Sequence, residues 1–172
     1  ILISCYNDSV KDVPSILLAP RPDVRYVVSH QMSSEEARPF PELFTRDDVI
    51  YSAFKGKGIS ANRNNSIRAL QDLFPDEQLC ILADDDVRYT DKMIDAILKS
   101  FNDNPEADII CGKIATPEGQ PEFKSYPDAK SWITAVPVYG SRYFSSIEVV
   151  FRLAPIVKSS ISFDEDFGLG SK

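Results

Sequence analysis

Three consecutive carboxylates at the end of an apolar run constrain the fold of this chain most strongly. Asp84, Asp85 and Asp86 directly follow the apolar residues 79–83. Such a run predicts a buried parallel strand, whose carboxyl end lies at the sheet edge where open α/β domains bind ligands. Adjacent carboxylates repel one another unless a cation neutralises them, and Mg²⁺ or Mn²⁺ prefers oxygen ligands. The alternative is a solvated acidic turn with one Asp capping the next helix.

The rest of the chain alternates between strand and helix patterns. Apolar runs at residues 1–5, 24–28, 49–53 and 108–112 predict further strands. One helix is expected from near Ser60, and Thr90 is expected to cap another. Their apolar stripes are Ile67, Leu70, Leu73 and Phe74 in the first helix, and Met93, Ile94, Ile97, Leu98 and Phe101 in the second. This alternation predicts an α/β fold with a mostly parallel central sheet and helices on both faces.

The last third of the chain is less regular. Residues 148–153 predict a returning strand, and Pro155 opens a short helical segment that reaches about Ser159. Aromatic residues between residues 132 and 144 suit either a loop that presents rings to a sugar or the filling of a core. They are Trp132, Tyr139, Tyr143 and Phe144, with Pro137 and Gly140 among them.

Four segments, in this order, resemble the family 2 glycosyltransferases with the GT-A fold. Residues 3–7 are similar to the opening strand and turn of the family, and residues 58–64 to its glycine-to-Arg-Asn helix start. Residues 82–86 resemble its metal-binding strand end, and residues 162–170 its acceptor-side segment. A similar His-Gln after the second strand occurs in bacterial capsule and surface-polysaccharide enzymes. The resemblance implies one Rossmann-like domain over residues 1–172, with a nucleotide-sugar half in 1–112 and an acceptor-side half in 113–172.

The resemblance assigns the carboxylates to a metal and a donor nucleotide. Asp86 is expected to bind Mn²⁺ or Mg²⁺ directly, and Asp84 to contact the ribose or a metal-bound water, because positions i and i+2 of a strand share one side. Asp85 is expected either to contact the sugar or to cap the next helix.

Further residues are expected to bind the nucleotide. Tyr6 offers a ring for stacking on uracil, with plain packing as the alternative, and Asn7 offers both a donor and an acceptor. The family usually places an Asp after the second strand, whereas Ser29, His30 and Gln31 stand here. Gln31 can pair with both kinds of group on uracil, and His30 has either a catalytic dyad role or a surface or structural one.

Two residues near the start of the first helix complete the expected donor site. Gly58 would allow close backbone approach. Arg63 would reach a diphosphate or clamp one Asp of the cluster, the alternative being an Arg on the exposed helix face. The family's general base follows the acceptor-side segment, which places it beyond Lys172 and implies a truncated acceptor half. Asp164, Glu165 and Asp166 are the nearby candidates for acceptor contacts or for the base.

The function implied is metal-dependent, inverting transfer of a hexose from a UDP-sugar to a saccharide or lipid-linked acceptor in polysaccharide biosynthesis. Two alternatives stay open. A sugar-phosphate nucleotidyltransferase would use a similar sheet, but ordinarily with a Gly-rich basic loop where Tyr6, Asn7 and Asp8 stand. A non-catalytic module that binds nucleotide-sugars is the other.

Composition restricts partners and compartment. The net charge of −7 without a basic cluster argues against nucleic acid. The sequence contains no run of about 18 apolar residues and therefore predicts no membrane span, so any membrane association is expected to be peripheral. Cys5, Cys80 and Cys111 have no CxxC spacing and lie in strand-like runs, which predicts buried free thiols. A cytoplasmic protein is expected, with a place at the inner face of the membrane left open.

Overall fold

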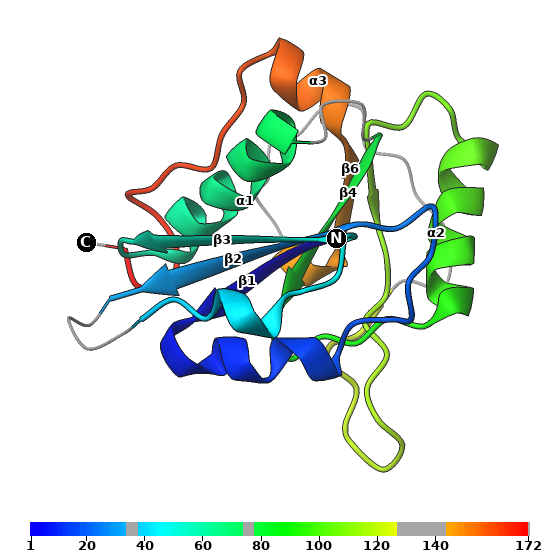
Figure 1. Ribbon diagram of the computed structural model, residues 1–172. Coiled ribbons are helices and arrows are strands. Elements are labelled where there is room, and N and C mark those ends of the chain that lie inside the picture. Colours follow the sequence, from blue (N-terminus) through cyan, green and yellow to red (C-terminus); the bar gives the residue numbers. More distant parts are fainter. Residues whose placement is uncertain (34–37, 74–77, 127–143, 172) are drawn as a thin grey trace.

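The computed structural model describes residues 1–33, 38–73, 78–126 and 144–171. The strands of its central sheet are β1 (Leu2–Tyr6), β2 (Tyr26–Met32), β3 (Val49–Lys55), β4 (Leu79–Asp84), β5 (Ile109–Cys111) and β6 (Val149–Arg152) (Figure 1). The α-helices are α1 (Ile59–Leu73), α2 (Asp91–Asp103) and α3 (Leu153–Lys158). Short 3-10 helices are η1 (Asn7–Lys11), η2 (Val13–Ser15), η3 (Pro41–Leu43) and η4 (Ser146–Glu148).

The six strands lie in the order β3-β2-β1-β4-β6-β5. β1 pairs in parallel with β2 and β4, and β2 pairs in parallel with β3. β6 runs antiparallel to both of its neighbours, β4 and β5. The predicted fold class, α/β with a mostly parallel sheet, is confirmed, and the carboxyl ends of β1 to β4 meet at one edge.

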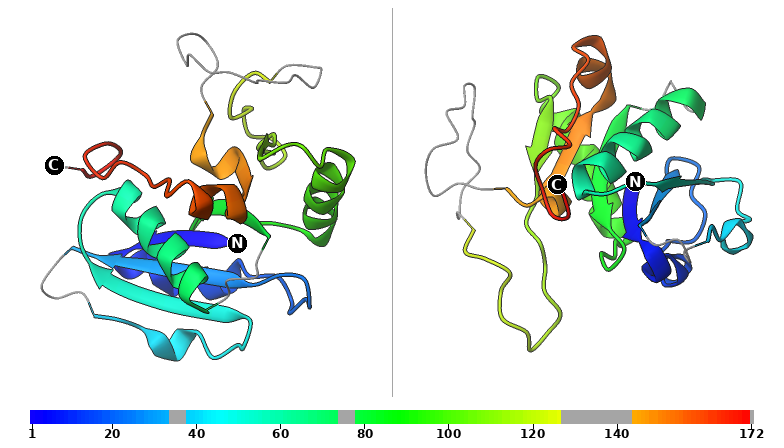
Figure 2. Two further views of the ribbon diagram at one scale, coloured as in Figure 1. Left: turned by 90° about the horizontal axis from the view of Figure 1, so that it is seen from above. Right: turned by 90° about the vertical axis from the view of Figure 1, so that its left-hand side faces the viewer.

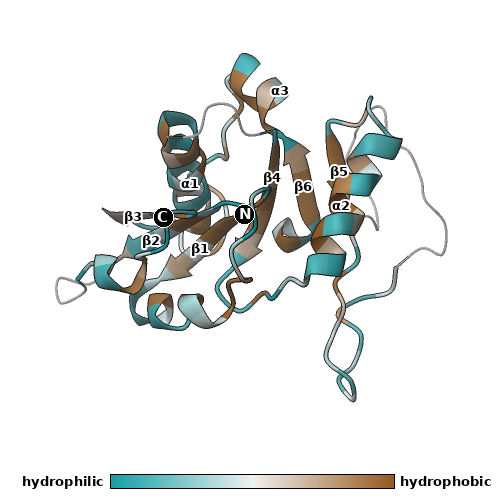
Figure 3. Cartoon of the chain, turned by 45° about the vertical axis from the view of Figure 1, so that its right-hand side comes forward, coloured by the Kyte–Doolittle hydropathy of each residue, from teal (hydrophilic) through white to brown (hydrophobic). Residues whose placement is uncertain are grey.

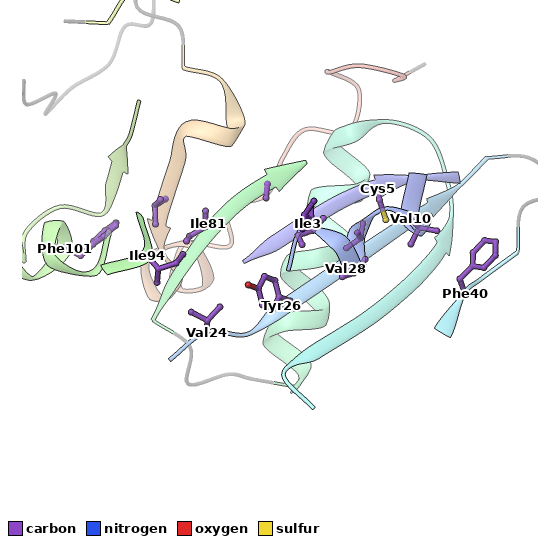
Figure 4. Close-up of a cluster of buried hydrophobic side chains, with 14 residues drawn as sticks. Ile3, Cys5, Val10, Val24, Tyr26, Val28, Phe40, Ile81, Ile94 and Phe101 are labelled. Carbon is purple, nitrogen blue, oxygen red and sulfur yellow. The ribbon is translucent and has the colours of Figure 1, made fainter. Parts of the chain in front are cut away.

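Both faces of the sheet are buried, because successive strand residues point to opposite sides. One face, with Leu2 and Val27, packs against α1 and α3. The other, with Ile3 and Val28, packs against η1, η2 and α2 (Figure 4). Figure 1 shows α1 and η1 on opposite sides of the sheet. The strands are largely hydrophobic along their length (Figure 3), as a parallel sheet covered on both faces requires.

The second predicted helix begins as expected. Thr90 is the N-cap of α2, and its Oγ1 accepts a hydrogen bond from the Met93 N–H at 3.3 Å. Ile94 and Phe101 of its predicted stripe are buried. No helix among the described residues is long and apolar enough to cross a membrane.

Several sequence-based details need correction. β2 does not end before Ser29, His30 and Gln31 but continues through them to Met32, and all three are buried. Leu73 is 59 % exposed instead of lying in the apolar stripe of α1. Cys111 is exposed because β5 is the edge strand, whereas Cys5 and Cys80 are buried and form no disulfide, as predicted. Other predicted residues lie outside the described part of the chain, namely Phe74, Trp132, Pro137, Tyr139, Gly140 and Tyr143.

Candidate functional site

The turn after β1 and the carboxylates after β4 lie side by side at the carboxyl edge of the sheet. β1 and β4 are hydrogen-bonded neighbours, with Ser4 opposite Asp84. Ser9 in η1 joins the two strand ends, because its Oγ contacts the Asp85 carboxylate and accepts a hydrogen bond from the Tyr6 N–H. The structure therefore brings Tyr6 together with Asp84, Asp85 and Asp86, here called the aspartate cluster, as the order of segments in the sequence predicts.

Asp84 is paired with Arg63 of α1. Arg63 Nη2 lies 3.4 Å from Asp84 Oδ1, and it donates a second hydrogen bond to Ser146 Oγ at 2.5 Å. The guanidinium also lies 5.8 Å from the ring centroid of Phe163. Burial raises the pKa of the Asp84 carboxyl, while Arg63 acts in the opposite direction and the charges of Asp86 and Asp85 raise it further. The guanidinium of Arg63 thus stabilises the charged form of the Asp84 carboxyl, which burial alone would disfavour.

Asp85 and Asp86 line a hollow of about 270 Å³ on the η1 side of the sheet. Its other lining residues are Ser9, Asp12, Ser15, Ile16 and Arg88. The sequence predicts Asp84 and Asp86 on one side, but β4 ends at Asp84 and the following residues form a turn, so strand alternation stops there. Within the described residues, the Asp86 carboxylate has no hydrogen bond or ion pair. It is the member of the cluster left available for a ligand.

The aspartate cluster fits a metal only in partnership with a substrate. Among the described residues, no group of three or more His, Cys, Asp or Glu side chains is arranged to hold a metal ion. Mg²⁺ is ordinarily bound by one or two carboxylates together with substrate phosphates, and not by a cage made of protein alone. An exposed Asp86 beside Asp84 and Asp85 matches that mode.

His30 fixes the turn that follows β1. Its Nε2 lies 2.8 Å from the Asn7 carbonyl, which can only accept, so Nε2 carries the proton. Its Nδ1 therefore accepts from the Tyr51 hydroxyl at 2.6 Å, and that hydroxyl accepts from the Phe40 N–H. Asn7 needs this support, since its φ of 48° is unusual for a residue other than glycine. Of the two roles predicted for His30, the contacts favour the structural one.

The remaining predicted nucleotide contacts are also engaged within the fold. Asn7 Oδ1 accepts from the Ser33 N–H at 3.0 Å, and Gln31 Nε2 donates to the Gly56 carbonyl at 3.1 Å. Tyr6 is 52 % exposed, with its hydroxyl against Ser33 Oγ. Tyr6 therefore presents a ring to solvent, whereas the contacts of Asn7 and Gln31 with a nucleotide base stay predictions.

His30 should make the protein sensitive to mild acid. Burial lowers the pKa of its imidazole from the ordinary 6.5, so the unfolded state binds a proton that the folded state does not. Its contribution to stability is complete above pH 6.5 and is lost as pH falls through the lowered pKa, with a limiting slope of about 1.4 kcal/mol per pH unit. Denaturant unfolding at successive pH values measures this slope.

His30→Gln is the comparison variant, since an amide can still donate and accept. It should flatten the pH dependence just below 6.5, where His30 is the only histidine to titrate. The carboxyls of Asp48 and Glu148, whose pKa values lie below 3.8 and 4.5, respond only at lower pH. An equal slope in the wild type and the variant would contradict the assignment.

The segment expected on the acceptor side, residues 162–170, lies across the start of α1. Asn64 makes hydrogen bonds to Phe163 and Glu165, and the Ile59 N–H donates to the Leu169 carbonyl at 3.0 Å. Gly58 has a φ of +91°. A Cβ at Gly58 would lie 3.5 Å from the Cα of Ser171, so the close backbone approach predicted there involves this chain's own segment. The three acidic candidates, Asp164, Glu165 and Asp166, are exposed.

Two contributors to the site are absent from the sequence-based prediction. Ser9 links Tyr6 to Asp85, and Ser146 binds Arg63. Ser9 lies in the polar turn after the first apolar run, so its place near the strand end is a signal that the sequence does carry. Ser146 is 83 positions from Arg63, and no local pattern indicates the contact.

Comparison with known proteins supports the fold. No family model and no curated protein sequence matches the chain. The crystal structure of Staphylococcus aureus TarS 1–349 matches with a TM-score of 0.65 and 16 % identity, over 97 % of this chain and 50 % of that chain. TarS 1–349 in complex with UDP matches with a TM-score of 0.60 and 16 % identity, over 98 % and 51 %. The chain thus spans about half of either TarS chain, and the likeness confirms the predicted GT-A fold.

Proposed function

We propose that this chain forms the donor-binding domain of a glycosyltransferase that takes a hexose from a UDP-sugar. One observation carries the proposal. The exposed Tyr6 ring and the aspartate cluster with Arg63 meet at the carboxyl edge of a sheet whose structural neighbour, TarS, is seen with UDP bound. A saccharide or lipid-linked acceptor, in polysaccharide biosynthesis, completes the proposed reaction.

The donor nucleotide has a place for each of its parts. The Tyr6 ring offers a stacking surface for uracil, since an aromatic ring next to a polar turn can cover the face of a base. Asp84, at the end of β4, would contact the ribose or a metal-bound water, and Asp85, the next residue, would contact the sugar. Arg63 provides a fixed guanidinium, whose planar fork suits the oxygens of a diphosphate.

Mn²⁺ or Mg²⁺ would be held by Asp86, with Asp84 or a water next to it, and would offset the charge that develops on the leaving diphosphate. Asp86 suits this role because Asp84 already pairs with Arg63 and Asp85 contacts Ser9. Arg63 supports the same charge from the opposite side of the cluster, as a preorganised donor needing no rearrangement.

The proposed transfer inverts the anomeric carbon, which requires a carboxylate that removes the proton of the acceptor hydroxyl. Asp164, Glu165 and Asp166 are exposed on the acceptor side and are the described candidates for acceptor contacts. Asp166 N–H donates to Asp164 Oδ1 at 3.0 Å, so Asp164 also orders the turn that carries them.

Calorimetry with UDP, GDP and dTDP, each with Mn²⁺ and with a chelator, tests the proposal. UDP should bind in the presence of metal, and Tyr6→Ala should weaken this binding by about 1–3 kcal/mol, the usual value of stacking between a base and an aromatic ring. Tyr6→Phe should retain most of the affinity because it keeps the ring. An equal affinity for UDP in the wild type, Tyr6→Ala and Tyr6→Phe would contradict stacking by Tyr6.

A turnover assay with UDP-sugar and a panel of acceptors, run beside the calorimetry, separates the alternatives. Transfer of sugar from UDP-sugar to an acceptor identifies a glycosyltransferase, whereas consumption of the nucleotide without sugar transfer identifies a nucleotidyltransferase. Binding without turnover in the full-length protein would indicate a non-catalytic module. No binding of any of the three nucleotides would contradict the proposed function.

A further inference from the structure

Residues 163–169 cross the first turns of α1 (Figure 2), and we infer that Asn64 is a positioning residue that fixes this acceptor-side segment for transfer. The inference rests on the proposed function, since a transferase gives the segment an acceptor to meet. Asn64 directly follows Arg63, the residue that pairs with Asp84 on the donor side.

Asn64 uses its whole side-chain amide on the segment. Its Nδ2 donates to the Phe163 carbonyl and to Glu165 Oε1, each at 2.9 Å. Its Oδ1 accepts from the Phe163 N–H at 2.9 Å. Asn64 is only 8 % exposed, so water cannot replace these bonds in place. One side chain therefore satisfies both backbone groups of Phe163 and orients the Glu165 carboxylate.

Hydrophobic burial does little to hold the segment. Phe167 is 70 % exposed and Leu169 is 88 % exposed. Phe163 is partly buried and packs against the core cluster on the α1 side of the sheet. Because few apolar contacts fix the course of the chain here, its polar contacts with α1 decide where the acidic side chains lie.

The other polar contacts hold the far end of the segment. Ser60 Oγ donates to the Phe167 carbonyl at 2.7 Å, and the Ile59 N–H donates to the Leu169 carbonyl. A Cβ at Gly168 would lie 2.9 Å from Ile59 Cγ2, so the backbone is pressed close to the helix. Asn64 is the contact at the near end, next to Asp164 and Glu165.

The sequence Arg63-Asn64 thus links the donor and acceptor sides through one turn of α1. Neighbouring helix positions point about 100° apart, so Arg63 can face Asp84 while Asn64 faces the segment. A rigid helix keeps the distance between the two sets of carboxylates constant. Transfer requires such a fixed geometry, since a misplacement of about 1 Å can lower the rate about a hundredfold.

Asn64→Ala in the full-length protein tests this role. Turnover at saturating UDP-sugar should fall by at least about tenfold, because misplaced groups lower the rate of the chemical step. The affinity for UDP should remain within about twofold, since the side-chain hydrogen bonds of Asn64 within the described residues go to Phe163 and Glu165 and not to the expected donor site. Amide hydrogen exchange in residues 163–167 should accelerate, because Phe163 loses both of its backbone partners.

Asn65→Ala is a matched control at the next position. Asn65 Nδ2 also donates two hydrogen bonds, to Ser29 Oγ at 2.9 Å and Ser52 Oγ at 3.0 Å, but these lie on β2 and β3. The control should lower stability without changing exchange in residues 163–167 or turnover. Equal losses of turnover in Asn64→Ala and Asn65→Ala would overturn the inference, because they would reflect stability alone.

A second pair of variants tests the contact itself. Asn64→Asp keeps an acceptor for the Phe163 N–H but places a carboxylate beside Glu165, so exchange in residues 163–167 should accelerate. Adding Glu165→Gln supplies an amide donor and should restore part of the protection. Unchanged exchange in both Asn64→Ala and Asn64→Asp would overturn the inference. A wild type that binds no UDP would instead contradict the proposed function, and exchange would still show whether Asn64 anchors the segment.

Discussion

Asp86→Ala should remove the metal dependence of UDP binding. In Mn²⁺ the affinity of the variant should fall at least about tenfold, which corresponds to about 1.4 kcal/mol, and should then equal its affinity in chelator. The physical reason is the division of roles within the cluster. Asp84 pairs with Arg63 and Asp85 contacts Ser9, so the available carboxylate is that of Asp86. Calorimetry with UDP in Mn²⁺, Mg²⁺ and chelator measures the effect.

Asp103→Ala is the control for this experiment. Asp103 ends α2, the helix that begins a few residues after Asp86, and it pairs with Lys99 at 2.6 Å on the exposed surface. The substitution removes the same charge from a similar side chain far along the helix. UDP binding should keep its full metal dependence in Asp103→Ala. A metal dependence that survives in Asp86→Ala would contradict the choice of Asp86 as the ligand.

The order of strands and helices could be predicted because it depends on local patterns. Short apolar runs between polar turns locate β1, β3, β4 and β6, and the Thr90 cap with its amphipathic stripe locates α2. The meeting of Tyr6 with the aspartate cluster follows from parallel strands that end at one edge.

The course of β2 could not be predicted, because tertiary partners decide it. Ser29, His30 and Gln31 are polar and suggest that the strand ends before them, yet each is buried and hydrogen-bonded in the strand. Ser29 Oγ donates to the Asn62 carbonyl, and His30 and Gln31 find partners in Asn7 and Gly56. A buried polar side chain is stable once such partners exist, but a single sequence does not name them.

The contacts that organise the site were hidden for the same reason. The sequence identifies Arg63 and Asn64 as part of one helix start, but the residues that they contact lie far along the chain. Ser146 is 83 positions from Arg63, and Phe163 is 99 positions from Asn64. Sequence reasoning can supply the residue types of a site, whereas the pairing of distant residues depends on how α1 packs between the strands β1, β2 and β3 and the segment after α3.

Arg63 joins these distant parts, and its loss should therefore affect both binding and transfer. In Arg63→Ala, Asp84 would keep its burial but lose its cation, which would raise the pKa of its carboxyl further. Ser146 Oγ would lose a donor at 2.5 Å, and the Phe163 ring would lose its neighbouring guanidinium. A diphosphate would also lose the cation that is held beside Asp84.

We expect Arg63→Ala to lower turnover about 10²–10³-fold, the effect of removing one preorganised donor from developing charge. Arg63→Lys should recover only part of this loss, because an ammonium restores the charge but not the planar fork that suits a diphosphate. In the wild type, one nitrogen of that guanidinium, Nη2, contacts both Asp84 and Ser146. Lys99→Ala is the control, since it removes a cation from the exposed surface of α2. Steady-state rates and UDP affinities of the three variants measure these effects, and equal rates in Arg63→Ala and Lys99→Ala would refute a role for Arg63 in transfer.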